Sequence, residues 1–450
     1  MRYANDILNR MTEEQIRDYQ TVLLKRQIRY CYDNSQFYRD RFRHVGAEPG
    51  DIGTLDDFFQ MPILMDKEQE RLSQSMSMER EGHPFGMHLC SSPGDVALTA
   101  TTSGTTGLPT FTYTLGRADL GMLNDGIKLM LRQAGIGWGE RVLFAYALGI
   151  YATSALLPPL RNAGVLPIDV DVRGGAEMIL KFAQMTKPSA AMMTPSLAQH
   201  LIDRIPHELG CSPRDLGWKA LFLVGEIGVG IPEIKQKLEA AYGCRAYDYI
   251  GPVGQTIACS CDSDDYHGMH AITPDTDLYP LDLIDPETKT HIPVTDGAEG
   301  EVVYTSLNRK TLPVLRYASG DIARVHIKPC PHCGFVGPRV EVIGRSDDML
   351  IIKGVNVYPG AIKQILNEFR PEVSGEMRIV LDTPPPRVEP PLRVKIEMAR
   401  DLGQDEVETL ETRLKAELHR RLRLTPAIEW VAPGTLPLAV AKTPLFEKAY

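Results

Sequence analysis

Apolar and polar residues recur at helical spacing near the start of the chain. A capping-box sequence, Thr12-Glu-Glu-Gln15, precedes an amphipathic stretch and predicts a helix from about residue 13 to residue 33. A second helix is predicted over 35–42. Gly, Pro and Asp interrupt the segment 44–100, where we expect short helices.

Short apolar runs alternate with amphipathic stretches between residues 141 and 249. The runs predict buried strands at 141–148, 165–170, 189–193, 220–224 and 245–249. The intervening patterns predict helices at 175–186, 197–204 and 231–242, and one more between the first two strands. This alternation implies a largely parallel sheet that is covered on both faces, whose ligands bind at the carboxyl ends of the strands.

The pattern changes twice in the last third of the chain. In the first of these regions, short strands are predicted at 281–285, 300–305 and 314–317. The second region begins at about residue 345 and is predicted to hold a helix near Pro359 and strands at 376–382, 392–398 and 428–432. It also holds a predicted helix with Val407, Leu410, Leu414 and Leu418 on one face. The predicted class is α/β. A large domain, 1–344, would hold mixed and parallel sheets covered by helices, with an antiparallel subdomain at about 271–344. A small mobile α+β domain, 345–450, would follow.

Composition and charge exclude several classes of protein. The 450 residues are 43% apolar and 24% charged, with a net charge of −9 and no long basic run, which argues against duplex nucleic acid as the partner. No stretch approaches about 18 uninterrupted apolar residues, and the first residues lack the apolar segment of a signal peptide. We therefore expect no membrane span and a cytoplasmic location. Eight cysteines in a chain of this length indicate thiols or a metal site rather than a disulfide framework.

The segment Thr101–Thr110 reads Thr-Thr-Ser-Gly-Thr-Thr-Gly-Leu-Pro-Thr. Glycines let a backbone turn tightly and approach a ligand, and free N–H groups and hydroxyls can then cradle phosphate oxygens. A solvent-exposed turn has the same composition. Phosphate-binding partners elsewhere in the chain would decide between the two.

Such partners follow in the order known from one superfamily. The matching segments are Thr194-Pro-Ser196, Gly225-Glu226, Ala246-Tyr-Asp248, Ile284-Asp-Pro-Glu287, Arg316-Tyr-Ala-Ser-Gly-Asp321 and the run from Gly344 to Pro359. With the Thr101–Thr110 loop, the chain resembles adenylate-forming enzymes, the acyl-CoA synthetase and adenylation-domain superfamily. It looks most like the phenylacetate–CoA ligase branch, over nearly its whole length.

The resemblance implies an ATP site. The β- and γ-phosphates would be held by Ser103, Gly104, Thr105, Thr106 and Gly107. Asp321 would accept both ribose hydroxyls, since one carboxylate can take two hydrogen bonds. Arg345 would reach phosphate or ribose. Residues on the adenine side would be Gly225, Glu226, Asp248 and Tyr249.

The resemblance also implies residues for catalysis and domain motion. Lys442 would bridge the substrate carboxylate and the α-phosphate, and would act with Arg345 and Thr106. A lysine suits this role as a mobile point charge on a long stem. Asp347 would be the hinge about which the small domain rotates between two half-reactions. Lys353 and Gly354 would then line the tunnel for the thiol acceptor.

Three positions depart from the family pattern. Leu108 stands where the phosphate loop usually carries lysine, and Ala441 precedes Lys442 where glycine is usual. The glutamate that binds magnesium in the family would fall at Val253 or Gly254, and neither side chain can ligate a metal. Candidates to replace it are Gln255, Thr256 and Glu226.

A second group of residues has the chemistry of a zinc site. Cys330-Pro-His-Cys333 is a CxxC knuckle, and Cys261 and His270 lie upstream. Two cysteines of a CxxC with one Cys and one His make a four-ligand set that zinc prefers. Cys259 and His267 are competing ligands. A structural zinc ion would pin the antiparallel subdomain.

The leading hypothesis is an acid–thiol ligase that uses ATP, Mg²⁺ and coenzyme A. It would activate an aromatic or similarly compact carboxylic acid as acyl-AMP, in a pocket near Phe144, Tyr146, Tyr151 and the end of the 220–224 strand. One alternative transfers the acyl group to an amine or to the thiol of a separate carrier protein. Another is a non-catalytic relative that binds acyl or adenylate ligands. A homodimer stays open, and neither nucleic acid nor a membrane is expected as a partner.

Overall fold

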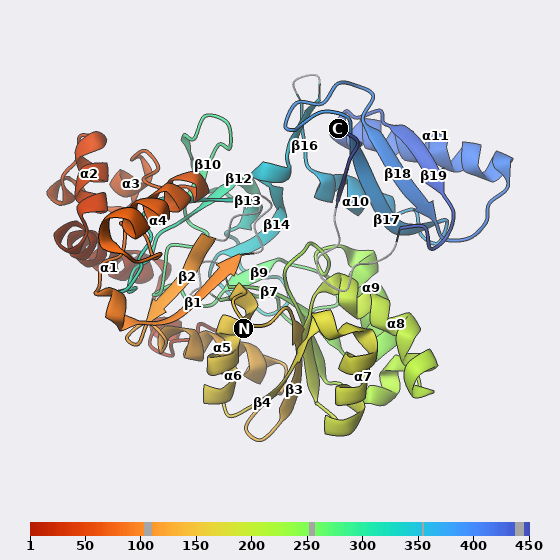
Figure 1. Ribbon diagram of the computed structural model, residues 1–450, viewed down its shortest axis with the longest axis horizontal. Coiled ribbons are helices and arrows are strands. Elements are labelled where there is room, and N and C mark those ends of the chain that lie inside the picture. The colour runs from red at the N-terminus through yellow and green to blue at the C-terminus, as the bar shows by residue number, and fades with distance from the viewer. Residues whose placement is uncertain (103–109, 252–256, 353–354, 437–444) are drawn as a thin grey trace.

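The structure is a computed structural model that describes residues 1–102, 110–251, 257–352, 355–436 and 445–450 (Figure 1). It gives the backbone alone for Thr102, Met122, Leu123, Asp347, Val355 and Asn356. Among the described helices, none has the length and apolar character needed to cross a membrane.

The largest sheet within the described residues has 12 strands, in the order β11-β10-β12-β13-β14-β9-β8-β7-β6-β5-β3-β4. Its parallel strands are β3 (Arg141–Tyr146), β4 (Leu166–Asp171), β5 (Ala190–Met193), β6 (Ala220–Leu223) and β7 (Arg245–Ile250). Its antiparallel strands are β8 (Ala258–Cys259), β9 (Met269–Ala271), β10 (Leu283–Ile284), β11 (His291–Ile292), β12 (Ala298–Tyr304), β13 (Tyr317–His326) and β14 (Arg339–Arg345). The predicted parallel sheet is confirmed, strand by strand.

The parallel strands separate two hydrophobic cores, one on each face. On β3, Val142 and Phe144 pack toward α5 (Met122–Gln133) and α6 (Leu157–Asn162), whereas Leu143 and Ala145 pack toward α7 (Gly175–Thr186), α8 (Pro195–Leu209) and α9 (Pro232–Tyr242). Because neighbouring residues of a strand point to opposite faces, an apolar run is buried on both sides. Figure 1 shows α7 and α8 covering one face of these strands.

The antiparallel strands are continuous with the parallel ones in this one sheet. Strand β8 joins the two sets, because it pairs antiparallel with β7 through Tyr249 and Cys259 and with β9 through Cys259 and His270. Antiparallel pairing therefore begins before residue 271. The strand predicted at 314–317 is also misplaced, since β13 begins at Tyr317.

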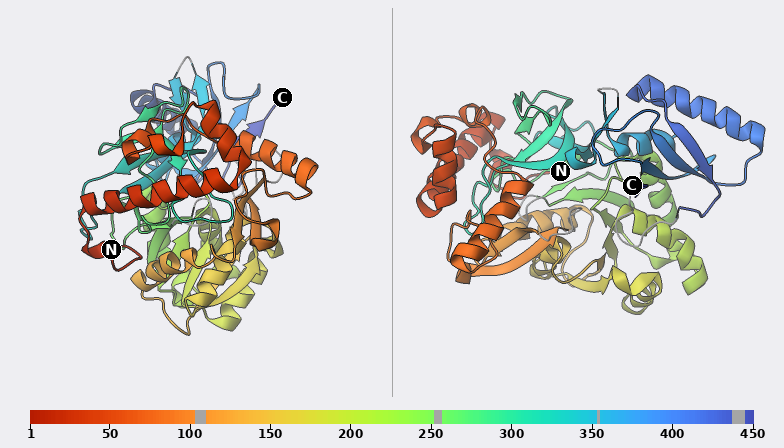
Figure 2. Two further views of the ribbon diagram at one scale, coloured as in Figure 1. Left: turned by 90° about the vertical axis from the view of Figure 1, so that its left-hand side faces the viewer. Right: turned by 45° about the horizontal axis from the view of Figure 1, so that its top comes forward.

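The N-terminal helices pack beside the antiparallel strands (Figure 2). They are α1 (Glu13–Asn34), α2 (Gln36–His44), α3 (Leu55–Phe59) and α4 (Lys67–Glu81). The predicted capping box is confirmed: the Gln15 backbone N–H donates to Thr12 Oγ1 at 3.3 Å, and the Thr12 N–H donates to Gln15 Oε1 at 2.9 Å. A hairpin of β1 (Val96–Thr102) and β2 (Thr110–Gly116) follows, which the sequence patterns did not predict.

The C-terminal region has its own sheet and core. Strands β17 (Val373–Leu381), β18 (Arg393–Met398), β19 (Ala427–Val431) and β20 (Phe446–Lys448) form a sheet in the order β19-β18-β17-β20. Helices α10 (Pro359–Asn367) and α11 (Gln404–Leu422) pack on it, α11 through the predicted residues Leu410, Leu414 and Leu418. A two-stranded ribbon, β15 (Leu350–Ile352) and β16 (Val355–Val357), leads into α10. The predicted α+β pattern is confirmed.

Candidate active site

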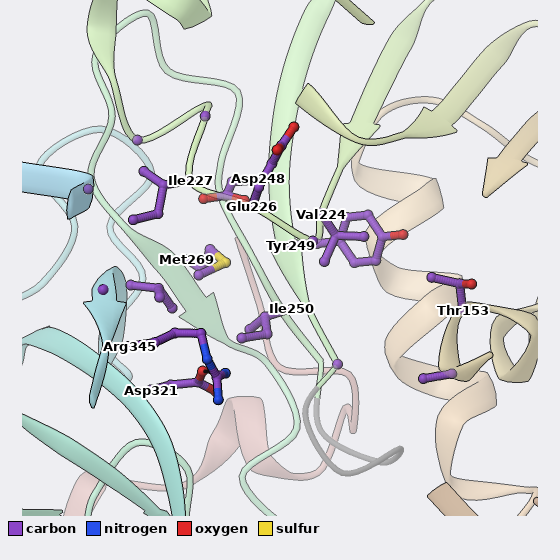
Figure 3. Close-up of a pocket in the computed structure, with 18 of the residues that line it drawn as sticks. Thr153, Val224, Glu226, Ile227, Asp248, Tyr249, Ile250, Met269, Asp321 and Arg345 are labelled. Atoms are coloured by element: carbon purple, nitrogen blue, oxygen red, sulfur yellow. Dashed lines mark hydrogen bonds and ion pairs between the residues drawn. The ribbon is translucent and has the colours of Figure 1, made fainter. Parts of the chain in front are cut away.

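A cavity of about 380 Å³ lies where the large sheet meets the C-terminal region. Its walls come from strand ends and loops of both, as Figure 3 shows. Predicted site residues that line it are Gly225, Glu226, Asp248, Tyr249, Asp321 and Arg345. Segments more than a hundred residues apart in the sequence thus meet at one hollow.

Asp321 and Arg345 form one wall of the cavity. They are direct partners across β13 and β14, and Arg345 Nη1 donates to Asp321 Oδ1 at 2.5 Å. The Tyr304 hydroxyl donates to Asp321 Oδ2 at 3.3 Å. Gly320 has φ of +79°, and a Cβ there would lie 3.1 Å from Arg345 Nη2, so glycine leaves room for the guanidinium. The carboxylate is held in place before any ligand arrives.

Glu226 is bound to the first turn of α8. Its Oε1 accepts the Ser196 backbone N–H at 2.6 Å and also the Ser196 hydroxyl. Thr194 caps the same helix by accepting the Leu197 N–H. An acidic side chain at a helix N-terminus is favoured by the backbone dipoles. The Thr194-Pro-Ser196 and Gly225-Glu226 motifs are therefore joined by hydrogen bonds. Glu226 is also the residue that the sequence offered as one possible replacement for the missing magnesium ligand.

Asp248 and Tyr249 end strand β7 at the cavity. Burial raises the pKa of the Asp248 carboxyl to about 7, although the Tyr266 hydroxyl donates to its Oδ2 at 2.8 Å and opposes the shift. The Tyr249 hydroxyl lies 3.0 Å from the Tyr146 hydroxyl, which donates to the Met193 carbonyl at 3.0 Å. These hydrogen bonds connect Tyr249, which lines the cavity, to β3 and β5 of the parallel part of the sheet.

The β1–β2 hairpin, whose strands flank the predicted phosphate loop in the sequence, lies beside this region. Thr102 and Thr110, which flank the loop, are paired in the hairpin. The Thr101 N–H donates to the Ile150 carbonyl at 2.7 Å, and the Tyr113 hydroxyl donates to the Gly251 carbonyl at 3.2 Å. Both ends of the hairpin segment therefore contact loops that border the cavity.

Several predicted site residues lie outside the described residues. They are Ser103, Gly104, Thr105, Thr106, Gly107, Lys353, Gly354 and Lys442, together with the departures Leu108, Val253, Gly254 and Ala441 and the possible substitutes Gln255 and Thr256. The backbone of Asp347, the predicted hinge, lies in a 3-10 helix, η8 (Ser346–Asp348), directly after β14.

The residues expected near the acid pocket line the cavity only in part. Phe144 and Tyr146 are buried in the core under the sheet and do not line the cavity, and Tyr151 is not among its wall residues. Val224, at the end of β6, does line it, as predicted. The remaining apolar lining on this side comes from Ala152, Ala155 and Leu156 of a 3-10 helix, η4 (Ala152–Leu156), with Thr153. Even-numbered β3 side chains pack into the core beneath α5 and α6, and because β3 is buried on both faces its apolar pattern does not show which face lies nearer the cavity.

Helix α10 supplies lining residues that sequence reasoning missed. Pro359, Gly360 and Lys363 border the cavity from the C-terminal region. A Cβ at Gly360 would lie 2.6 Å from Ile227 Cδ1 and 3.0 Å from the Ile343 carbonyl oxygen, both in the large domain. The signal available in the sequence was their position at and just after the end of the Gly344–Pro359 motif.

The four predicted metal ligands meet outside the cavity. Cys261, His270, Cys330 and Cys333 have ligand atoms within 4.8 Å of one another. Cys261 Sγ lies 4.0 Å from Cys330 Sγ, and Cys333 Sγ lies 3.3 Å from His270 Nε2. Tetrahedral zinc with 2.3 Å bonds to sulfur separates its sulfur ligands by about 3.8 Å. Spacing and donor set therefore fit zinc, and the competing Cys259 and His267 are not in the cluster.

Comparisons with known proteins agree with this arrangement of the site. The AMP-binding enzyme C-terminal domain family matches residues 354–446. The phenylacetate-coenzyme A ligase of Thermus thermophilus is 28% identical over 449 residues, which cover 96% of this chain and 95% of that protein. The crystal structure of 2-hydroxyisobutyryl-CoA ligase in the postadenylation state, in complex with 2-HIB-AMP, has a TM-score of 0.84 and 26% identity, and covers 97% of this chain and 90% of that one.

The chain is therefore similar, over nearly its whole length, to coenzyme A ligases of the phenylacetate–CoA ligase-like branch. A second structure of that ligase allows the placement of the C-terminal region against the large sheet to be compared. The same 2-hydroxyisobutyryl-CoA ligase in the thioesterification state has a TM-score of only 0.67, at 27% identity and with 98% and 91% of the two chains covered. The arrangement of this chain is therefore closer to the postadenylation state of that ligase than to its thioesterification state.

Proposed function

We propose that the protein is an AMP-forming acid–CoA ligase whose acid is aromatic or of similar compact size. The observation that carries this proposal is the meeting of Gly225, Glu226, Asp248, Asp321 and Arg345 around one cavity. Adenylation needs groups that hold ribose, adenine and transferring phosphate in one orientation. The resemblance assigns these roles to these residues.

Each described residue has a chemical task in this scheme. Asp321, already oriented by Tyr304 and Arg345, accepts the ribose hydroxyls. Arg345 keeps its positive charge beside the phosphate path, where charge develops as pyrophosphate leaves. Magnesium ion, when bound, supplies neutralisation of the phosphate charges. The apolar wall at Ala152, Ala155 and Leu156 suits the apolar body of a compact acid.

The C-terminal region, 345–450, would act as a lid that rotates about Asp347. In the present arrangement, α10 closes one side of the cavity, and Leu445 from the end of the chain lines it. Leu445 follows Lys442 by three residues in the sequence, and its place at the cavity supports a role for this end of the chain in the reaction. After rotation, Lys353 and Gly354 would line the path of the coenzyme A thiol.

Two half-reactions test the proposal. Acid-dependent exchange of pyrophosphate into ATP measures adenylation, and release of acyl-CoA from added acyl-AMP measures transfer. Lys442→Ala should lower exchange by about a hundredfold or more, while transfer is largely retained. Lys448→Ala, in exposed β20, is the matched control and should change neither. No acid-dependent exchange with a panel of aryl and short branched acids would contradict the proposal.

Coenzyme A is favoured as the acceptor because the relative and the solved neighbour are named as coenzyme A ligases. A carrier-protein thiol or an amine remains the second candidate only as a sequence hypothesis. Product mass with coenzyme A as the sole acceptor separates the two.

The same proposal includes one structural zinc ion, bound by Cys261, His270, Cys330 and Cys333. Cys261 and His270 lie beside β8 and on β9, the short strands that connect the parallel and antiparallel strands of the large sheet. Zinc at this point would fix the knuckle onto the junction of the sheet.

A further inference from the structure

Helix α4 faces the protein interior with polar side chains. Its buried residues are Glu70, Ser73, Gln74 and Ser77, which share one face because they are three or four positions apart. Leu72 and Met78 are instead exposed, by 59% and 52%. A surface helix ordinarily has the reverse distribution. Buried polar groups are costly unless they are hydrogen-bonded, so this face is built to bind polar partners.

Glu70 joins two strands that belong to different sides of the predicted nucleotide site. It is fully buried, and its Oε2 accepts the Thr112 hydroxyl at 3.0 Å and the Tyr317 hydroxyl at 2.9 Å. Thr112 lies on β2, two residues after the phosphate-loop segment ends at Thr110. Tyr317 begins β13, the strand that carries Asp321 four residues later.

Neighbouring contacts strengthen this link. Gln74, one turn further along α4, accepts the Phe111 backbone N–H at 3.1 Å, so two consecutive β2 residues are bound to the helix. Arg309 Nη2 donates to the Thr114 carbonyl at 2.8 Å, and its positive charge acts on Glu70.

We propose that Glu70 is a positioning residue for ATP, which holds β2 at a fixed distance from β13 and its Asp321. Ribose and the β- and γ-phosphates are joined covalently, so their two protein sites must keep one spacing. A shift of about 1 Å between them weakens binding of the whole ATP molecule. The inference rests on the proposed function in one respect, namely that ribose lies at Asp321 and phosphate at the loop before β2.

Binding of two nucleotides separates positioning from general stability. The Kd values of a nonhydrolysable ATP analogue and of AMP are measured by calorimetry. Glu70→Leu should raise the Kd of the analogue by about tenfold or more. The Kd of AMP should rise by less than about twofold, because AMP lacks the β- and γ-phosphates that the loop is proposed to hold. Glu70→Gln keeps an oxygen acceptor and should stay within about threefold of wild type. Glu68→Leu, exposed on the same helix, is the matched control.

Equal weakening of both nucleotides by Glu70→Leu, or no weakening of either, would overturn the inference. If that variant does not fold, Thr112→Val and Tyr317→Phe each remove one hydrogen bond and should weaken the analogue selectively by roughly threefold to tenfold. Absence of this selectivity in both also overturns it. A wild-type protein that binds the analogue but shows no exchange contradicts the ligase activity alone, whereas failure to bind either nucleotide contradicts both proposals.

Discussion

Arg345 and Asp321 face each other across β14 and β13, with 2.5 Å between Nη1 and Oδ1. Their opposition in the ladder fixes two groups of the proposed nucleotide site at once, because neither strand can slip by one residue without turning both side chains away.

Asp321→Ala should raise the KM for ATP by about tenfold to a hundredfold, since it removes the proposed acceptor of the ribose hydroxyls and leaves Arg345 without this partner. The KM for the acid should change little. Pyrophosphate exchange with varied ATP and then varied acid measures both. Glu299→Ala, on the neighbouring β12 and exposed, is a control on the same sheet. An equal change in both KM values would argue against a ribose-specific role.

Gly360→Val should disfavour the present placement of the C-terminal region. The new side chain would clash with Ile227 and the Ile343 carbonyl. Such overpacking should shift the equilibrium away from the present placement of the C-terminal region by roughly tenfold or more. Pyrophosphate exchange should fall, while acyl-CoA formation from added acyl-AMP is retained. At the exposed Gly403 of the same region, the nearest neighbour of a Cβ is 3.7 Å away, so Gly403→Val should leave the ratio of the two rates unchanged. Loss of both rates together for Gly360→Val would indicate misfolding.

Metal analysis should find about one equivalent of zinc in purified protein. Cys330→Ser should lose most of it and lower the thermal midpoint by several degrees, because metal binding contributes directly to folding. Cys259→Ser tests the competing ligand: its sulfur donates to the Ser260 carbonyl at 3.5 Å, and zinc should be retained. Less than about half an equivalent in the wild type would contradict the four-ligand site.

The stability of the protein should depend on the ionisation of Glu70. Burial raises the pKa of this carboxyl from 4.5 to about 7, against the lowering effect of Tyr317, Thr112, Arg309 and Lys67. Because the folded-state pKa lies above the unfolded value, stability is present at low pH and is lost as the pH rises from about 4.5 to about 7, at roughly 1 kcal/mol per pH unit.

Glu70→Gln should remove that slope. The urea midpoint of this variant, measured relative to that of the wild type, should therefore rise as the pH increases from 5 to 8. Parallel midpoint curves for the two proteins would show that the carboxyl ionises normally in the folded state.

Regular patterns made the parallel sheet and most of its helices predictable. Ala220–Leu223 is a wholly apolar strand followed by Gly225, and the stripe Leu410, Leu414 and Leu418 repeats every four residues. In such segments the same face, or both faces, are buried along the whole length, so the apolar pattern alone identifies the element. The site residues Asp321 and Arg345 were found through motif resemblance, because no periodicity distinguishes a ribose-binding aspartate from a turn residue.

The missed elements have mixed or very short patterns. β1 and β2 are rich in threonine, and β8 and β9 span only Ala258–Cys259 and Met269–Ala271. Their positions are set by pairing with distant strands, as in the register of Arg339 with His270. Helix α4 was hidden for another reason: its inward stripe is polar, so its partners Thr112 and Tyr317 had to be known before its buried face could be recognised.

The unbroken sheet also determines where the chain can be cut for production of fragments. A fragment that ends between Tyr249 and Ala258 would leave β7 as a bare edge, with its backbone N–H and C=O groups free to recruit other molecules and precipitate. A cut after Arg345 severs no ladder of the large sheet, because β14 is its last strand in the sequence. For crystallisation or labelling of either piece, the chain should therefore be divided there.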